Sequence, residues 1–335
     1  MKKRKQNRLS WTFRLQSEKK EDKYMNLNEL MWSTRNLYIR GIDNAVANAN
    51  GYINRIRLTT RLVPREPDYV AALIRCLSCF YSNYLSNFNN QGIEGRFISQ
   101  FIHRSPIIEI GNNSPRTRCE LGDILFVHIN KDIRRKKTGN AILFQAKRSG
   151  IIPCGLSTVR EMLQLRLYRE WPGFTYNGRR INVFPKAPHT GAKYLIIKDP
   201  HRNFTNARCF SAMPSEDLFS SSKLSRELFD FHIFNSGRPF IPRMLRDSWS
   251  KLICNLIDFN VGTFNQRAGR FIRSSRSRRN NYSLICDSNQ FRENNYSLFS
   301  INKAFDNEPP KSILKTNDNS EKGMYILLLE THEID

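Results

Sequence analysis

The sequence lacks long apolar runs and is poor in acidic residues relative to basic ones. No stretch approaches the 18 consecutive apolar residues that a membrane-spanning helix needs. The first twenty residues carry a basic cluster with no apolar segment behind it, which is not the pattern of a secretory signal. We therefore expect a cytoplasmic protein with no membrane partner.

Cysteine is scarce and irregularly spaced, with seven residues in a chain of 335. An odd number at irregular spacing argues against a disulfide framework and favours a reduced, intracellular protein. Cys76 and Cys79 have the two-residue spacing of a zinc pair, but they lie in an apolar helical segment with no second pair. We interpret them as core residues.

Several catalytic motifs are also missing. The chain contains no GxxxxGK[ST], GxSxG, GxGxxG or HExxH. Their absence argues against a P-loop NTPase, an α/β-hydrolase, a simple dinucleotide enzyme and a zincin.

What is abundant is positive charge. The chain has 54 Lys and Arg against 30 Asp and Glu, a formal charge of +24, which implies a polyanionic partner, nucleic acid first. Residues 259–286 contain six arginines and no acid, and we expect them to contact phosphates rather than form only a solvated loop. They are Arg267, Arg270, Arg273, Arg276, Arg278 and Arg279.

The middle of the chain has the periodicity of an α/β domain. Helices are expected at residues 94–104 and 156–171, and strands at residues 106–110, 121–130, 140–149 and 192–198. This order is α-β-β-β-α-β. Thr158 and Glu161 have the capping-box spacing for the second helix.

Four regions follow from these patterns. We expect a basic flexible arm (1–25), a helical N-terminal region (26–90), the α-β-β-β-α-β core (91–200) and a basic C-terminal extension (201–335). Outside the core, residues 67–85 and 248–259 have helical periodicity, and residues 281–286 and 324–330 are expected strands.

The two central strands bring chemistry together. If the hairpin 121–149 folds about residue 135, Asp123 lies opposite Lys147, and Gln145 shares their face. An acid, an amide oxygen and an amine at one end of an apolar hairpin cost free energy unless a hard cation offsets them. The lysine could then orient or help deprotonate the water that attacks a phosphodiester.

A second acid is expected nearby. Glu94 lies three, four, seven and eight residues before apolar residues of the expected helix 94–104, which places it on the core-facing stripe. The alternative interpretation is a helix N-terminal acid that answers the helix dipole. Glu109 on a neighbouring strand could replace it, whereas Glu120 should face away from Asp123 in a regular strand.

Gly122-Asp123 and Gln145-Ala146-Lys147 together resemble the motif of the PD-(D/E)XK nuclease superfamily. The similarity is to the branch in which Gln replaces the second acid, as in Mrr-type restriction endonucleases, and it covers about residues 93–198. It implies a restriction-endonuclease-like fold with Asp123, Gln145 and Glu94 binding Mg²⁺ or Mn²⁺ and Lys147 as the catalytic lysine. Two departures are the glycine in place of proline and the neutral Gln145.

The resulting hypothesis is a metal-dependent endonuclease that hydrolyses phosphodiester bonds, of DNA before RNA. A role in restriction or mobile-element defence, and a homodimer, follow only by analogy with the family. The alternatives are a catalytically inactive nucleic-acid-binding protein of the same fold and a basic structural or ribonucleoprotein component. Binding is expected to be salt-sensitive in every case, so only cleavage separates these functions.

The remaining polar and aromatic residues of this region have simpler interpretations. His128 is expected to be a strand residue, and Tyr168 and Trp171 are expected in the core. Arg160, Arg166 and Arg169, on the expected helix after Lys147, could still face a substrate.

Overall fold

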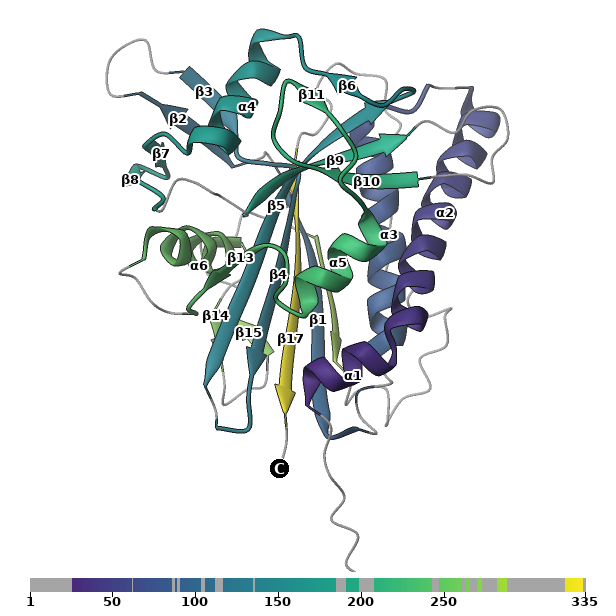
Figure 1. Cartoon of the computed structure of the whole chain (residues 1–335), viewed down its shortest axis with the longest axis vertical. Helices are drawn as coiled ribbons and strands as arrows, with labels where there is room; N and C mark the ends of the chain where they lie inside the picture. The colour runs from purple at the N-terminus through teal and green to yellow at the C-terminus, as the bar shows by residue number, and fades with distance from the viewer. Residues whose placement is uncertain are drawn as a thin grey trace, which may run out of the picture.

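A computed structural model describes most of residues 26–333. The residues left undescribed within that span are 62, 86–87, 89–90, 104–105, 112–116, 135, 185–190, 199–207, 243–246, 261–262, 266–269, 273–281 and 288–322. The described chain builds one large twisted sheet with helices on both faces (Figure 1).

The described helices belong to two layers. They are α1 (Leu27–Ser33), α2 (Arg35–Thr60), α3 (Glu66–Leu85), α4 (Val159–Glu170), α5 (Leu224–His232) and α6 (Ser248–Asn260). Apolar residues of α1, α2, α3 and α5 pack on one face of the sheet. Those of α4 and α6 pack on the other.

The large sheet has nine described strands. Eight follow the spatial order β12 (Ser222–Lys223), β10 (Arg208–Ala212), β9 (Ala192–Lys198), β5 (Lys137–Ser149), β4 (Ile124–Lys131), β17 (Gly323–Glu333), β1 (Ile93–His103) and β16 (Tyr282–Asp287). The ninth, β13 (Arg238–Phe240), pairs with the beginning of β5. Two pairs are parallel, β5 with β9 and β4 with β17.

Smaller sheets flank the large one. A four-stranded sheet has the order β3 (Thr117–Glu120), β2 (Ile107–Ile110), β7 (Phe174–Tyr176) and β8 (Arg179–Ile181). Two further pairs are β6 (Cys154–Gly155) with β11 (Asp217–Leu218), and β14 (Thr263–Asn265) with β15 (Arg270–Ile272).

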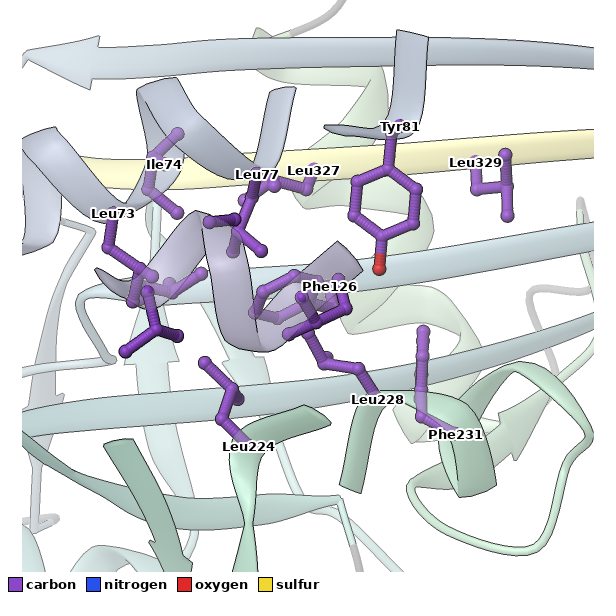
Figure 2. Packing of buried hydrophobic residues seen from close by; sticks show 14 of the residues in the cluster. Leu73, Ile74, Leu77, Tyr81, Phe126, Leu224, Leu228, Phe231, Leu327 and Leu329 are labelled. Atoms are coloured by element: carbon purple, nitrogen blue, oxygen red, sulfur yellow. The ribbon is translucent and has the colours of Figure 1, made fainter. Parts of the chain in front are cut away.

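The central strands are apolar on both faces because both faces are covered. In β4, Phe126 belongs to the core under α3 and α5, while its neighbour Leu125 belongs to the core under α4 and α6. Figure 2 shows the first core, in which Leu77 of α3, Leu228 of α5 and Phe126 of the sheet point toward one another. Strands buried on both faces have near-continuous apolar runs, which is the pattern of β4 and β5.

Several sequence expectations are confirmed. α3, α4, α6 and β9 coincide with the expected segments to within a few residues. Thr158 caps α4 through the expected box, with its hydroxyl accepting from the backbone of Glu161 and the Glu161 carboxylate accepting in return. Tyr168 and Trp171 are buried, and His128 is a buried residue of β4.

The expected helix over residues 94–104 is wrong, because this segment is strand β1. Phe97 and Ile98 are adjacent and lie on opposite faces of the sheet, in two different cores. A strand covered on both faces has apolar residues at odd and even positions, and these mimic a helical stripe over a short segment. Tertiary packing therefore overrides the local pattern.

The expected strand at 106–110 is present as β2, but it belongs to the four-stranded sheet and not to the central one. The neighbour of β4 on that side is β17, from the far end of the chain. The α-β-β-β-α-β order expected over residues 91–200 is therefore wrong in its first helix and first strand. The mixed α/β class is confirmed.

Two further expectations have limited coverage. In the part of the chain that the structure describes, no helix is both long and apolar enough to cross a membrane. The expected basic arm, residues 1–25, lies outside the described residues.

Candidate active site

The site lies at the open end of the β4–β5 hairpin. The register pairs Ile124 with Phe144 and Lys131 with Lys137, so the hairpin folds about residue 134 and not 135. The partner of Asp123 is therefore Gln145, and the expected pairing with Lys147 is wrong. The amide Nε2 of Gln145 donates to Oδ2 of Asp123, and Lys147 follows two residues later on the same face.

Asp123 is a carboxylic acid whose ionisation is unfavourable in the folded protein. Its Oδ2 also accepts from the backbone N of Ala146 at 2.7 Å. Burial is the main reason that the pKa of Asp123 is raised to about 8. The carboxylates of Glu66 and Glu120 add to the rise, and the Ala146 hydrogen bond and Lys147 act against it. A bound cation would relieve this cost.

Gln145 supplies an acceptor without a donor. Its side chain is buried, and Oε1 has no hydrogen-bond partner among the described residues. An unsatisfied buried amide oxygen costs about 1–3 kcal/mol. Beside the Asp123 carboxylate, such an oxygen has the chemistry of a ligand for a hard cation.

Lys147 is held by an acid that the sequence had marked only as a helix cap. Its Nζ lies 2.9 Å from Oε1 of Glu161, and both side chains are largely buried. Oε2 of Glu161 accepts from the backbone N of Thr158 at 3.0 Å and of Ser157 at 3.1 Å. Burial opposes ionisation, but these hydrogen bonds and Lys147 lower the pKa of Glu161 to about 2.

Glu66, the first residue of α3, is the acid that sequence reasoning missed. Its Oε2 accepts from the backbone N of Arg148 at 3.0 Å. The Arg148 guanidinium donates to the carbonyl of Pro64 at 2.7 Å and lies 5.0 Å from the Tyr69 ring. Burial raises the pKa of Glu66, and Lys147 acts against that shift.

These contacts tie the N-terminus of α3 to the end of β5. The only local signal for Glu66 was its place beside Pro67 at a helix start. Nothing in the sequence placed it beside Arg148, 82 residues away.

Glu94 does not reach this site, so its assignment as a metal ligand is wrong. It pairs with His332 across β1 and β17, and its carboxylate lies 3.9 Å from the His332 Nδ1. The carbonyl of Asp123 accepts from the backbone N of Tyr325, which places Asp123 level with Met324 of β17. The partner of Met324 in β1 is Ile102. Eight residues of strand, roughly 26 Å, separate the two acids.

The two alternatives to Glu94 have different outcomes. Glu109 lies in the four-stranded sheet, with its carboxylate 3.1 Å from Arg118. Glu120 was expected to face away, but β3 ends at Glu120 and β4 begins only at Ile124, so strand alternation does not connect it with Asp123. Glu120 lies close enough to raise the pKa of Asp123.

Most of the arginines expected to contact phosphates lie outside the described residues. Arg267, Arg273, Arg276, Arg278 and Arg279 lie outside the described residues, and of Arg270 only the backbone, in β15, is described. On α4, Arg160 lies 2.5 Å from Glu120 and Arg166 lies 3.0 Å from Glu170, so both are engaged with acids.

The donor set at the hairpin fits a divalent cation in part. Among the described residues no three His, Cys, Asp or Glu side chains are grouped to hold a metal ion. What is present is one carboxylate, Asp123, and one unsatisfied amide oxygen, from Gln145. This is the sparse protein coordination that suits Mg²⁺, which keeps several waters and takes oxygens from a phosphate substrate.

The chain was compared with protein-family models, with curated proteins and with solved structures, and none of them matches it.

Proposed function

We propose that this protein is a metal-dependent nuclease that hydrolyses phosphodiester bonds, of DNA before RNA. The observation that carries the proposal is the meeting of Asp123, Gln145 and Lys147 at one end of the hairpin, with the Gln145 oxygen left unsatisfied. The formal charge of +24 supports a polyanionic substrate.

In this proposal the side chains have distinct tasks. Asp123 and Gln145 hold the cation, and Lys147 donates a hydrogen bond that orients the attacking water or a phosphoryl oxygen. Glu66 is the helix acid near this pair and acts on Asp123 electrostatically, which Glu94 is too far away to do. A bound Mg²⁺ or Mn²⁺ would supply Lewis-acid stabilisation of the negative charge that develops on the phosphoryl group.

The element order supports the same proposal with new boundaries. α3, β1, β4, β5, α4 and β9 follow one another as α-β-β-β-α-β within the large sheet and its helices, with β2, β3, β6, β7 and β8 inserted as strands of smaller sheets. One departure is β17, which lies between β1 and β4. A restriction-endonuclease-like core would thus span residues 66–198, beginning earlier than the sequence pattern predicts.

The decisive experiment is a cleavage assay on linear, circular and single-stranded DNA and on RNA, with Mg²⁺, Mn²⁺ or EDTA. It compares the wild type with Asp123→Asn and Lys147→Ala. Glu94→Gln is the matched control, because it removes an acid of the same sheet far from the site. We expect metal-dependent cutting that both site variants lose and the control keeps. Cutting that survives both site substitutions would refute this site.

A second candidate is a non-catalytic nucleic-acid-binding protein of the same fold. The neutral Gln145 and the lack of a three-acid group among the described residues favour it. Salt-dependent binding by folded wild type, without cutting of any substrate, would select this candidate. A role in restriction or in defence against mobile elements would follow only if cutting is found.

A further inference from the structure

We propose that Glu161 is a positioning residue that fixes the Lys147 ammonium group by tying it to the N-terminal cap of α4. The inference rests on the proposed function for its catalytic consequence. The contact itself does not depend on that function, so the two can fail separately.

The carboxylate of Glu161 divides its two oxygens between two tasks. Oε2 accepts from the backbone N atoms of Ser157 and Thr158 and from the Thr158 hydroxyl at 3.0 Å. Oε1 accepts from Nζ of Lys147 at 2.9 Å. Because the cap holds the carboxylate in one orientation, Oε1 is held at one place above the end of β5.

Several other acidic side chains lie near Lys147. Glu66 on α3 and Asp123 before β4 both interact electrostatically with Lys147, and Glu120 on β3 lies beside Asp123. Among the contacts described for Nζ, the only hydrogen bond is to Glu161. A flexible four-carbon side chain is thereby fixed in one rotamer beside Asp123 and Gln145.

Positioning by Glu161 has a chemical consequence. A lysine held by a fixed carboxylate acts as an oriented cation toward the phosphate or the attacking water, and a displacement of about 1 Å can cost a hundredfold in rate. The N-terminal end of α4 would thus set the geometry of a reaction whose groups Asp123, Gln145 and Lys147 belong to the β4–β5 hairpin and the residue before it.

The test compares Glu161→Gln with Thr158→Ala. Thr158→Ala removes the other half of the capping box, at a cost of about 1 kcal/mol, and leaves Lys147 with its carboxylate. Glu161→Gln removes the charge, and its single amide oxygen can serve either the cap or Lys147 but not both. We expect the single-turnover cleavage rate to fall about 10- to 100-fold in Glu161→Gln, with unchanged DNA affinity, and to change little in Thr158→Ala.

A second readout needs no cleavage. Limited acetylation with acetic anhydride, quantified by mass spectrometry, compares Lys147 with the exposed Lys136 at the other end of the hairpin. We expect Lys147 to react several-fold faster in Glu161→Gln than in the wild type or in Thr158→Ala. Equal labelling in all three proteins would overturn the inference, whatever the outcome of the cleavage assay.

A double-mutant comparison completes the design. If Glu161 acts through Lys147, adding Glu161→Gln to Lys147→Ala causes no further loss of residual cleavage. Additive losses, or equal losses in Glu161→Gln and Thr158→Ala, would show that Glu161 serves only to stabilise α4. Absence of cutting by the wild type would refute the proposed function, and the labelling ratio would still decide the role of Glu161.

Discussion

Two of the polar clusters on this sheet differ in how they accommodate burial. The hairpin cluster consists of Asp123, Gln145, Lys147, Glu161 and Glu66. The histidine cluster consists of His128, His232, Tyr81, Tyr38 and Thr331. The first carries charge at the edge of the sheet, where most of its members keep some exposure; the second is neutral and sealed between sheet and helices.

The histidine cluster is linked by short hydrogen bonds. The Tyr81 hydroxyl lies 2.8 Å from both the Tyr38 hydroxyl and the His232 Nε2, and His128 Nε2 lies 3.0 Å from the Thr331 hydroxyl. Burial lowers the pKa of His128 to about 3 and lowers that of His232 as well, so both rings are neutral at pH 7. This cluster joins β4 and β17 to α2, α3 and α5.

The difference in charge between the two clusters indicates which one is the better candidate for a functional site. The histidine cluster buries no charge, although Nδ1 of His128 and Nδ1 of His232 have no hydrogen-bond partner among the described residues. A partly buried carboxylate with a raised pKa is unfavourable for folding, and its retention is what a functional site predicts. The clusters should therefore respond oppositely to substitution, pH and metal.

The largest effect is expected for Asp123→Asn. Cleavage should fall by about a thousandfold or more, because both the cation ligand and its charge are lost. Stability should rise by about 4 kcal/mol at pH 7, because an acid whose pKa is raised from 3.8 to about 8 destabilises the fold between those values. Urea unfolding in EDTA measures the second effect, and a less stable variant would contradict it.

The pH dependence of stability should separate the clusters. A histidine whose folded pKa is depressed stabilises the protein above pH 6.5 and loses that contribution as the pH falls. From pH 6.5 to 5 we expect a loss of about 2 kcal/mol from His128 and a further loss from His232. Asp123 changes in the opposite direction over this range, so the loss should be larger in Asp123→Asn than in the wild type. If the free energy of unfolding, measured with urea at each pH, changed equally with pH in the two proteins, this opposition would be refuted.

Mg²⁺ should stabilise the folded protein through the hairpin cluster and not through the histidine cluster. At a Mg²⁺ concentration a hundred times its Kd, the free energy of unfolding should increase by about 2.7 kcal/mol. Thermal unfolding with Mg²⁺ or EDTA should show this shift in the wild type and in Glu94→Gln, and not in Asp123→Asn. A shift that persists in Asp123→Asn would place the cation elsewhere.

Tyr81→Phe tests the histidine cluster alone. Loss of the hydroxyl leaves Tyr38 and His232 without a shared partner and should cost about 1–3 kcal/mol of stability. The cleavage rate of the folded variant should match the wild type. A reduced rate at full folding would mean that the two clusters are coupled.

The smallest effect is expected at Gly122. A Cβ there would lie 2.8 Å from the Tyr168 hydroxyl, which donates to the carbonyl of Leu121. Gly122→Ala should therefore cost about 1 kcal/mol or more in chemical denaturation. Adding Tyr168→Phe should recover part of it, and a double variant less stable than the sum of the two single ones would contradict this contact. The close approach gives a physical reason for glycine at this position.

Local signals predicted the elements around the site well. The caps and stops of α3 and α4 and the apolar runs of β4, β5 and β9 depend on nearby residues, so the chain alone indicates them. The pairing of Asp123 with Gln145 was missed by one residue in the turn, because turn length sets hairpin register.

Longer-range features could not be predicted. β1 resembled a helix because both of its faces are buried, and burial on both faces depends on α3 and on β16 and β17, from the far end of the chain. Glu94 was assigned to the site on that pattern and lies at the other end of the sheet.

By itself, therefore, the sequence determined the basic charge, the mixed α/β class, the central hairpin and the acid, amide and lysine at its end. Only the tertiary structure decided which further acids join them. Because α3 and α4 begin beside the end of β5, Glu66 accepts from the backbone of Arg148 and Glu161 accepts from Lys147 while its other oxygen caps α4. Contacts between residues so far apart in the sequence depend on how the helices pack against the sheet, and local sequence patterns do not specify that packing.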